Sequence, residues 1–228
     1  MKKIILFFLI FAFSAVSVFS QNILNEILKR QEQHSKLLKS LQGEISITKS
    51  FEGQPEVFYK RGTFYFLPSQ TYALSIDIAK PIKEIFSMYK NEYVFYQTNP
   101  SPIFLDDKAA AYSGKITNSQ KNTFILFSLL QNFSRKELRT NYDIVYTGEE
   151  KTVNGTLAWH LFLKPKTNSQ IKKLDIWIDS NGMPIQSKML DNTGVSTTIV
   201  LNDFTKNSAI NADKFAVRIP KGVPILKN

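Results

Sequence analysis

The chain has 228 residues, a formal net charge of +10 at pH 7, 18 phenylalanines and no cysteine. Its length suits one ordinary domain or two small ones, and a domain of this size can bury a core that needs no disulfide or metal staple. The basic balance favours anionic partners such as lipid, acidic protein or polysaccharide, but the charges are scattered, which indicates a solvated surface rather than a binding stripe.

The first twenty residues are predicted to be a cleaved export signal. Lys2 and Lys3 precede an apolar run from Ile4 to Phe19, and Ser20 supplies a small residue before the cleavage site. A membrane anchor is the alternative, but the run is shorter than the ~20 residues that span a bilayer. We expect a single mature domain over residues 21–228 in the periplasm. A nucleic-acid partner is not expected there, and a lipid anchor would need cysteine where Gln21 stands.

Residues 22–41 are predicted to form one amphipathic helix. Asn22 is a candidate N-cap, and Gly43 is expected to stop the helix. Apolar residues recur at helical spacing along the segment: Ile23, Leu24, Ile27, Leu28, Leu37, Leu38 and Leu41.

After Gly43 the hydrophobic period changes to two, which predicts a β-meander in which each strand pairs with the next. The expected strands cover residues 44–48, 57–67, 72–78, 82–89 and 93–96. Residues 97–121 are predicted to be a long loop. A buried helix is expected over 123–132, with a further helical turn at 135–138.

Strands resume in the second half of the chain, where the alternation is clearest. They are expected over 142–147, 157–165, 174–178, 185–189, 195–201 and 215–217, with a hairpin turn at Ser180–Gly182 and another at Asp191–Gly194. The chain is therefore predicted to be mainly β, with about eleven strands, one long leading helix and short internal helices.

The sequence offers no recognisable enzyme site. His34 and His160 lie far apart without metal-ligand spacing, and His160 is expected to be a surface residue. Asp106–Asp107 and the pair Asp175 and Asp179 could supply an acid and a base, but solvated carboxylates are the favoured interpretation. Neither a nucleophile elbow nor a phosphate-binding glycine loop is present. We therefore predict no enzyme activity, no metal and no cofactor.

The aromatic residues concentrate in strands 57–66 and 86–96 and in helix 124–133. They could fill an ordinary β core, since aromatic residues favour strands. They could equally line a ligand cavity, and composition does not separate these two interpretations.

Motifs in the last third of the chain follow a familiar order. Their ending, Phe215 followed by Pro220, Gly222 and Val223, is the most recognisable part. The preceding motifs are Leu163–Lys166, Ile171–Asp179, Asn181–Gly182, Gly194–Phe204 and Asn207–Asn211. With the leading helix, Gly62–Phe66 and Pro68, this order resembles the periplasmic outer-membrane lipoprotein carriers, the LolA-like family.

The resemblance implies an incomplete, strongly curved antiparallel β-barrel whose concave apolar side is covered by a helical lid. It implies a soluble, monomeric periplasmic carrier that acts as a chaperone for the acyl chains of lipoproteins or related lipids. Such a carrier receives cargo from an inner-membrane lipoprotein-release complex and passes it to an outer-membrane acceptor. The physical need is clear, because exposing hydrocarbon to water costs about 0.8 kcal/mol per methylene.

The inward parity of the predicted strands selects the residues expected to line the lipid cavity. They are Phe64, Phe66, Tyr72, Leu74, Ile76, Leu161, Ile176, Ile178, Met189, Ile199 and Leu201. The residues expected in the lid are Leu24, Ile27, Leu28, Leu38, Phe124, Phe127 and Leu130. Carriers of the best-known type have a lid-holding arginine before the proline that ends the second strand. Here Leu67 occupies that latch position, before Pro68.

Two alternatives remain open at the level of sequence. Similar half-barrels serve as lipid- or lipoprotein-sensing interaction modules that bind a membrane regulator, although these usually carry an additional domain. An envelope hydrolase is the other alternative, and it lacks a recognisable nucleophile–base set.

Overall fold

A computed structural model of the chain describes residues 21–51, 54, 57–68, 73–80, 82–98, 109–116, 125–130, 134–167 and 170–227. The predicted export signal, Tyr72 and Phe124 lie outside the described residues. Among the described residues no helix is both long enough and apolar enough to cross a membrane.

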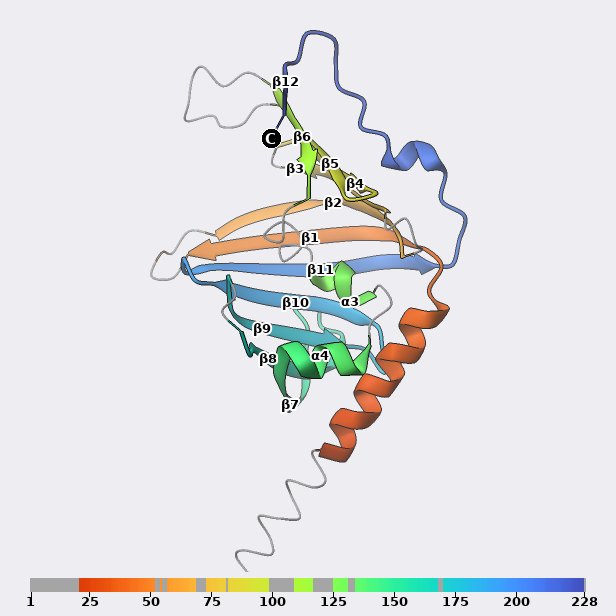
Figure 1. Cartoon of the computed structure of the whole chain (residues 1–228), viewed down its shortest axis with the longest axis vertical. Helices are drawn as coiled ribbons and strands as arrows, with labels where there is room; N and C mark the ends of the chain where they lie inside the picture. Colours follow the sequence, from red (N-terminus) through yellow and green to blue (C-terminus); the bar gives the residue numbers. More distant parts are fainter. Residues whose placement is uncertain are drawn as a thin grey trace, which may run out of the picture.

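A single twelve-stranded sheet forms the body of the protein (Figure 1). It is strongly curved and does not close, with β12 and β7 at its two edges, in the order β12-β6-β5-β4-β3-β2-β1-β11-β10-β9-β8-β7. Neighbouring strands are antiparallel except for β12, which runs parallel to β6. The strands are β1 (Leu41–Phe51), β2 (Val57–Leu67), β3 (Ala73–Lys80), β4 (Glu84–Tyr89), β5 (Glu92–Gln97), β6 (Ala110–Lys115), β7 (Tyr142–Lys151), β8 (Leu157–Pro165), β9 (Ile171–Ile178), β10 (Pro184–Asp191), β11 (Val195–Lys206) and β12 (Ile225–Lys227).

The strand count differs from the expected eleven at three places. β6 lies inside the segment predicted to be a loop, where the small residues Ala110 and Ala111 gave no alternating pattern but pair with β5. β12 was not predicted. The expected strand at 215–217 is absent. Phe215 instead ends a 3-10 helix, η1 (Ala212–Phe215), which the Asn211 side chain caps by accepting from the backbone N–H of Asp213.

The N-terminal helix covers residues 21–37 and ends earlier than predicted. The side chain of Asn207 caps its end, accepting from the backbone N–H of Lys39 at 2.7 Å and donating to the carbonyl of Leu37 at 3.3 Å. Gly43 therefore does not stop the helix. It lies within β1, where an added Cβ would come within 2.7 Å of the Cα of Phe204, so a close approach of two strands requires glycine there.

Two short helices lie on the same side of the sheet as the N-terminal helix: α3 (Ile125–Leu130) and α4 (Arg135–Asn141). Both were predicted in outline, and Ser134 caps α4 by accepting from the backbone N–H of Glu137. Figure 1 shows α3 and α4 in front of the half of the sheet that runs from β11 to β7, with the red N-terminal helix beside them. Leu24, Ile27 and Leu28 of the N-terminal helix pack with buried residues of β8, β9 and β10. The helices therefore cover one face of the sheet, which we call the inner face.

The chain after β11 crosses the opposite face, which we call the outer face. The hydroxyl of Ser87 donates to the carbonyl of Phe215 at 2.6 Å, and the ammonium of Lys214 lies 5.1 Å from the ring centre of Tyr65. This segment then leads into β12, which pairs with β6 at the edge of the sheet. It therefore connects the middle of the sheet to one of its edges.

Candidate functional site

The strand register brings the predicted cavity residues together on the inner face. Direct cross-strand pairs share a face of a sheet, and such pairs join Leu161 to Ile176, Phe64 to Ile76 and Phe66 to Leu74. The described members of the predicted set all have this parity and are buried: Phe64, Phe66, Leu74, Ile76, Leu161, Ile176, Ile178, Met189, Ile199 and Leu201. Six neighbouring strands, β2 and β3 together with β8 to β11, thus contribute to one apolar surface, which β1 bridges.

The predicted lid residues lie over this surface in two buried clusters. Leu38, Phe127 and Leu130 belong to one cluster with Phe64 and Phe66. Leu24, Ile27 and Leu28 belong to the other, which includes the β8, β9 and β10 residues of the inner face. Protein side chains therefore fill the space over these strands, and the structure shows the covered arrangement of the inner face.

Phe127 of α3 contacts two phenylalanines of the inner face. Its side chain is fully buried, and its ring centre lies 5.4 Å from the ring centres of both Phe64 and Phe66. The three rings meet in edge and tilted orientations that aromatic pairs favour. A guest on this part of the sheet would have to displace Phe127.

Gln31 makes a polar connection between the N-terminal helix and α3. Its Nε2 donates to the backbone carbonyl of Leu129 at 2.7 Å, and the residue is only 3% exposed. Its Oε1 is buried without a hydrogen-bond partner among the described residues. A buried amide that is only half satisfied is a weak point in an otherwise apolar contact, so this joint is suited to opening.

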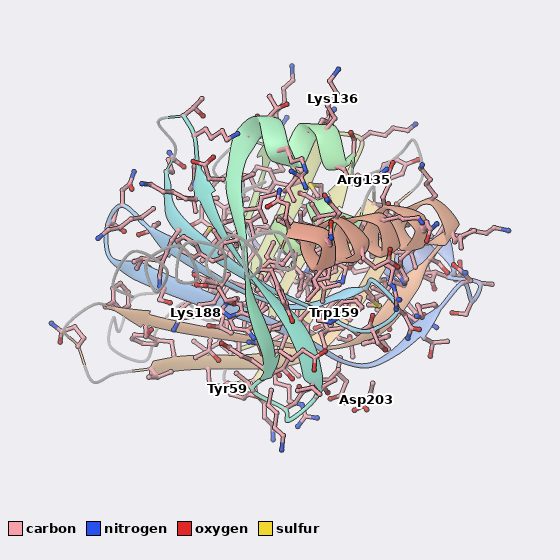
Figure 2. All side chains as sticks on the ribbon, turned by 90° about the horizontal axis from the view of Figure 1, so that it is seen from below. Tyr59, Arg135, Lys136, Trp159, Lys188 and Asp203 are labelled. Atoms are coloured by element: carbon pink, nitrogen blue, oxygen red, sulfur yellow. The ribbon has the colours of Figure 1, made fainter. Side chains whose placement is uncertain are left out.

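Polar contacts on the surface join the N-terminal helix to α4. Arg135 of α4 lies 2.5 Å from Glu32 of the N-terminal helix, and Arg139 donates to Asn25 at 2.6 Å. Hydrogen bonds from Lys36 and then Arg135 lower the pKa of Glu32. Figure 2 shows Arg135 and Lys136 on α4, on the side of the sheet that carries the N-terminal helix. Exposed pairs of this kind stabilise weakly, so the lid is held mainly by its apolar contacts.

The predicted latch position, Leu67, is half-buried at the end of β2. Leu67 pairs with Ala73, and its parity places it on the face opposite Phe66. The role of Leu67 stays a prediction. Gln31 was missed, although its spacing from Leu24, Ile27 and Leu28 places it on the apolar stripe of the helix.

Replacing Gln31 with alanine is expected to lower the free energy of unfolding by about 1–3 kcal/mol, because the Leu129 carbonyl loses its donor in a buried position. Denaturant unfolding measures this change. Gln33→Ala, an exposed change on the same helix, is the control and should stay within about 0.5 kcal/mol. Equal effects of the two changes would contradict a connecting role for Gln31.

The far end of the inner face is charged. Lys60 Nζ lies 2.6 Å from both carboxylate oxygens of Glu84, and Lys49 shares the face with this pair. Burial lowers the pKa of Lys49, and the positive charge of Lys60 acts in the same direction. The inner face is therefore apolar over most of its length and cationic or polar at one end.

His160 and Asp175 are buried together on the outer face, contrary to two expectations from the sequence. His160 has a side chain only 12% exposed, with Nε2 3.0 Å from an Asp175 oxygen and its ring stacked on Trp177 at 4.4 Å. Asp175 is buried as well. Both residues were wrongly expected at the solvated surface, because alternation predicts a face but does not show how tightly neighbouring side chains cover it. Among the described residues no group of three or more potential ligands is placed to hold a metal ion.

A groove of about 600 Å³ also lies on the outer face. Tyr59 and Arg61 of β2 contribute to its lining, as do Asn154, Asn202 and Asp203. Asn154 Nδ2 donates to Asn202 Oδ1 at 2.7 Å, which holds the turn between β7 and β8 against β11. Figure 2 places Tyr59 and Asp203 far from α4, so this groove is separate from the inner face.

Comparison with protein families gives one match, to the outer membrane lipoprotein carrier protein LolA, over residues 101–218. This is just over half of the chain. No curated protein matches it.

Solved structures are similar to this chain at low sequence identity. MucB is 13% identical with a TM-score of 0.52, over 85% of this chain and 62% of MucB. MucB from Pseudomonas aeruginosa, solved in complex with MucA, is 14% identical with a TM-score of 0.48, over 85% and 60% of the two chains. The Mycobacterium tuberculosis lipoprotein LppX is 10% identical with a TM-score of 0.48, over 85% and 100%. This chain thus spans about three fifths of the length of the MucB chains.

Proposed function

Because the chain belongs to the family of the outer membrane lipoprotein carrier protein LolA, we propose that it is a periplasmic carrier. It shields the acyl chains of lipoproteins, or of related lipids, and transfers them from the inner to the outer membrane. The observation that carries this proposal is the apolar inner face of an unclosed sheet, covered by helices that pack on it through two apolar clusters.

The covered arrangement is the resting state in this proposal. Acyl chains displace Phe127 and the N-terminal helix, and they take over the contacts that Phe64 and Phe66 make with α3. An acyl chain of about fifteen methylenes recovers roughly 12 kcal/mol on leaving water. Uncovering several buried leucine and phenylalanine side chains costs about 1.5–3 kcal/mol each. The two quantities are comparable, so loading and release are both feasible without nucleotide hydrolysis on the carrier.

The resemblance to the carrier family implies the partners in this proposal. An inner-membrane lipoprotein-release complex would load the carrier, and an acceptor at the outer membrane would take the cargo. Removal of residues 1–20 after export would leave the N-terminal helix at the start of the mature chain, where it can swing away from the sheet.

Binding of a dipalmitoyl lipopeptide by delipidated protein tests the proposal. We expect saturable binding that the same peptide without acyl chains does not show. Ile47→Asp places a charge on the inner face of β1 and should weaken binding by more than about tenfold.

Thr48→Asp is the matched control, because Thr48 is the next residue of the same strand and lies on the outer face. It should bind the lipopeptide as the unmodified protein does. Equal losses in the two variants, or no acyl-dependent binding at all, would refute the proposed function.

The groove on the outer face supports a second candidate, a lipid- or lipoprotein-sensing module that binds a membrane regulator. In this alternative the polar side chains of the groove, Arg61 among them, contact the partner. Arg61→Ala should then abolish regulator binding and leave lipopeptide binding unchanged, whereas Ile47→Asp should do the reverse.

A further inference from the structure

We propose that the cargo is an acyl lipid with an anionic head group, and that Lys49 binds this anion at the charged end of the inner face. This inference rests on the proposed carrier function and names the cargo class.

Lys49 continues the apolar row of β1. Ile45, Ile47 and Lys49 alternate along the strand on the inner face, and Lys49 pairs with Phe58 of β2 and Thr197 of β11. From Leu41 to Lys49 the strand extends about 26 Å at roughly 3.3 Å per residue. One leaflet of a bilayer holds acyl chains within about 15 Å. The apolar part of the face is therefore long enough for an extended chain whose head group reaches Lys49.

Lys49 and its neighbour Lys60 differ in their ion pairing. Lys60 is bound by both oxygens of Glu84 at 2.6 Å. Among the described residues no carboxylate lies within ion-pair distance of Lys49. Glu84 and Asp191 are both near enough to act on Lys49 electrostatically, but Glu84 is bound to Lys60. The Oδ1 of Asp191 accepts hydrogen bonds from the backbone N–H groups of Thr193 and Val195.

Lys49 is partly buried, so its lack of an ion-pair partner among the described residues has an energetic cost. The pKa of Lys49 is lowered because the ammonium has lost part of its hydration and lies near Lys60. A phosphate or carboxylate at this point would replace the lost hydration with a charge-assisted hydrogen bond.

Aromatic side chains flank Lys49 on the same face. The rings of Phe51 and Phe58 lie 6.0 Å apart and are 42% and 53% exposed. A long lysine stem and exposed rings beside a buried apolar surface form an apolar-to-polar boundary, the environment in which the head group of a bound lipid would sit.

Paired lipids test the assignment. Fluorescent phosphatidylglycerol and phosphatidylethanolamine with identical acyl chains are titrated into delipidated full-length protein. We expect about tenfold tighter binding of phosphatidylglycerol. Lys49→Met should reduce this preference to less than about twofold while leaving phosphatidylethanolamine binding intact, and Lys49→Arg should retain the preference.

Lys188→Met is the matched control, because it removes the same charge from an exposed position on the outer face. It should keep the preference. Palmitate and palmitoyl glycerol form a second pair. Tighter binding of palmitate through Lys49 would extend the site from phosphate to carboxylate, and equal binding would restrict it to phosphate head groups with a net negative charge.

Two outcomes overturn the inference: equal binding of the two phospholipids by the unmodified protein, or an undiminished preference in Lys49→Met. Either outcome leaves acyl binding, and hence the carrier proposal, in place. If neither phospholipid nor the lipopeptide binds, the carrier function itself fails.

Discussion

Gly182→Ala is expected to push the N-terminal helix away from the sheet and to lower the free energy of unfolding by about 2–4 kcal/mol. Gly182 lies in the turn between β9 and β10 with φ +86°, and an added Cβ would meet backbone atoms of Arg30 and Gln31 at 2.4–2.6 Å. Backbone cannot rotate away as a side chain can. The helix must therefore move, and the hydrogen bond from Gln31 to Leu129 breaks with it.

Gly155→Ala separates this effect from ordinary backbone strain. Gly155 has the same φ of +86° but nothing within 4 Å of its added Cβ, so only the conformational cost of about 1–2 kcal/mol remains. Denaturant unfolding gives both values.

Helix position is measured through a single cysteine at Leu37, which is 72% exposed in a chain without cysteine. We expect a spin label there to gain mobility in Gly182→Ala and not in Gly155→Ala. Identical mobility in the two variants would show that the turn does not hold the helix.

The inner face could be predicted from the sequence because alternation along a strand has a fixed period of two. Ile176 and Ile178, or Phe64 and Phe66, must share a face wherever their strand pairs. The described cavity residues have one parity for this reason. The expectation that they line a lipid cavity is a separate matter and stays a prediction until binding is measured.

Other features depended on contacts that no local pattern records. Leu37, Leu38 and Leu41 fit a helical stripe, yet the chain leaves the helix after residue 37 because Asn207, distant in sequence, caps it. β6 forms because β5 and β12 are available as neighbours. The covering of His160 by Glu150, Asp175 and Trp177 likewise arises only in the assembled sheet.

Gln31 and Lys49 were within reach of the same periodic reasoning. Position 31 lies on the apolar stripe of its helix, and position 49 continues the inward parity of Ile45 and Ile47. Neither residue belongs to the predicted cavity or lid, because those sets contain only apolar and aromatic residues. A polar residue at an apolar position of a repeat is itself a signal, since burial of a polar group needs a partner.

Phe127→Ala is expected to convert the covered inner face into a partly open one. The side chain is fully buried between Phe64 and Phe66, and its loss should lower the free energy of unfolding by about 3–5 kcal/mol. In a filled core that loss would be the only consequence. In a carrier, the vacated space is the space that an acyl chain occupies, so the lipopeptide no longer has to displace a phenylalanine and should bind about tenfold more tightly or better.

Phe162→Ala removes the same side chain from the outer face of β8, where Phe162 is half-buried, and serves as the control. It should lower stability without tightening lipopeptide binding. Unfolding measured with and without the same concentration of lipopeptide joins the two readouts, because a ligand that binds only the folded state raises its stability by an amount that grows with the logarithm of its affinity. Ligand should therefore recover more of the lost stability in Phe127→Ala than in Phe162→Ala. A Phe127→Ala protein that is destabilised but binds no more tightly would indicate that Phe127 belongs to a permanent core, and that acyl chains, if they bind, do so elsewhere on the sheet.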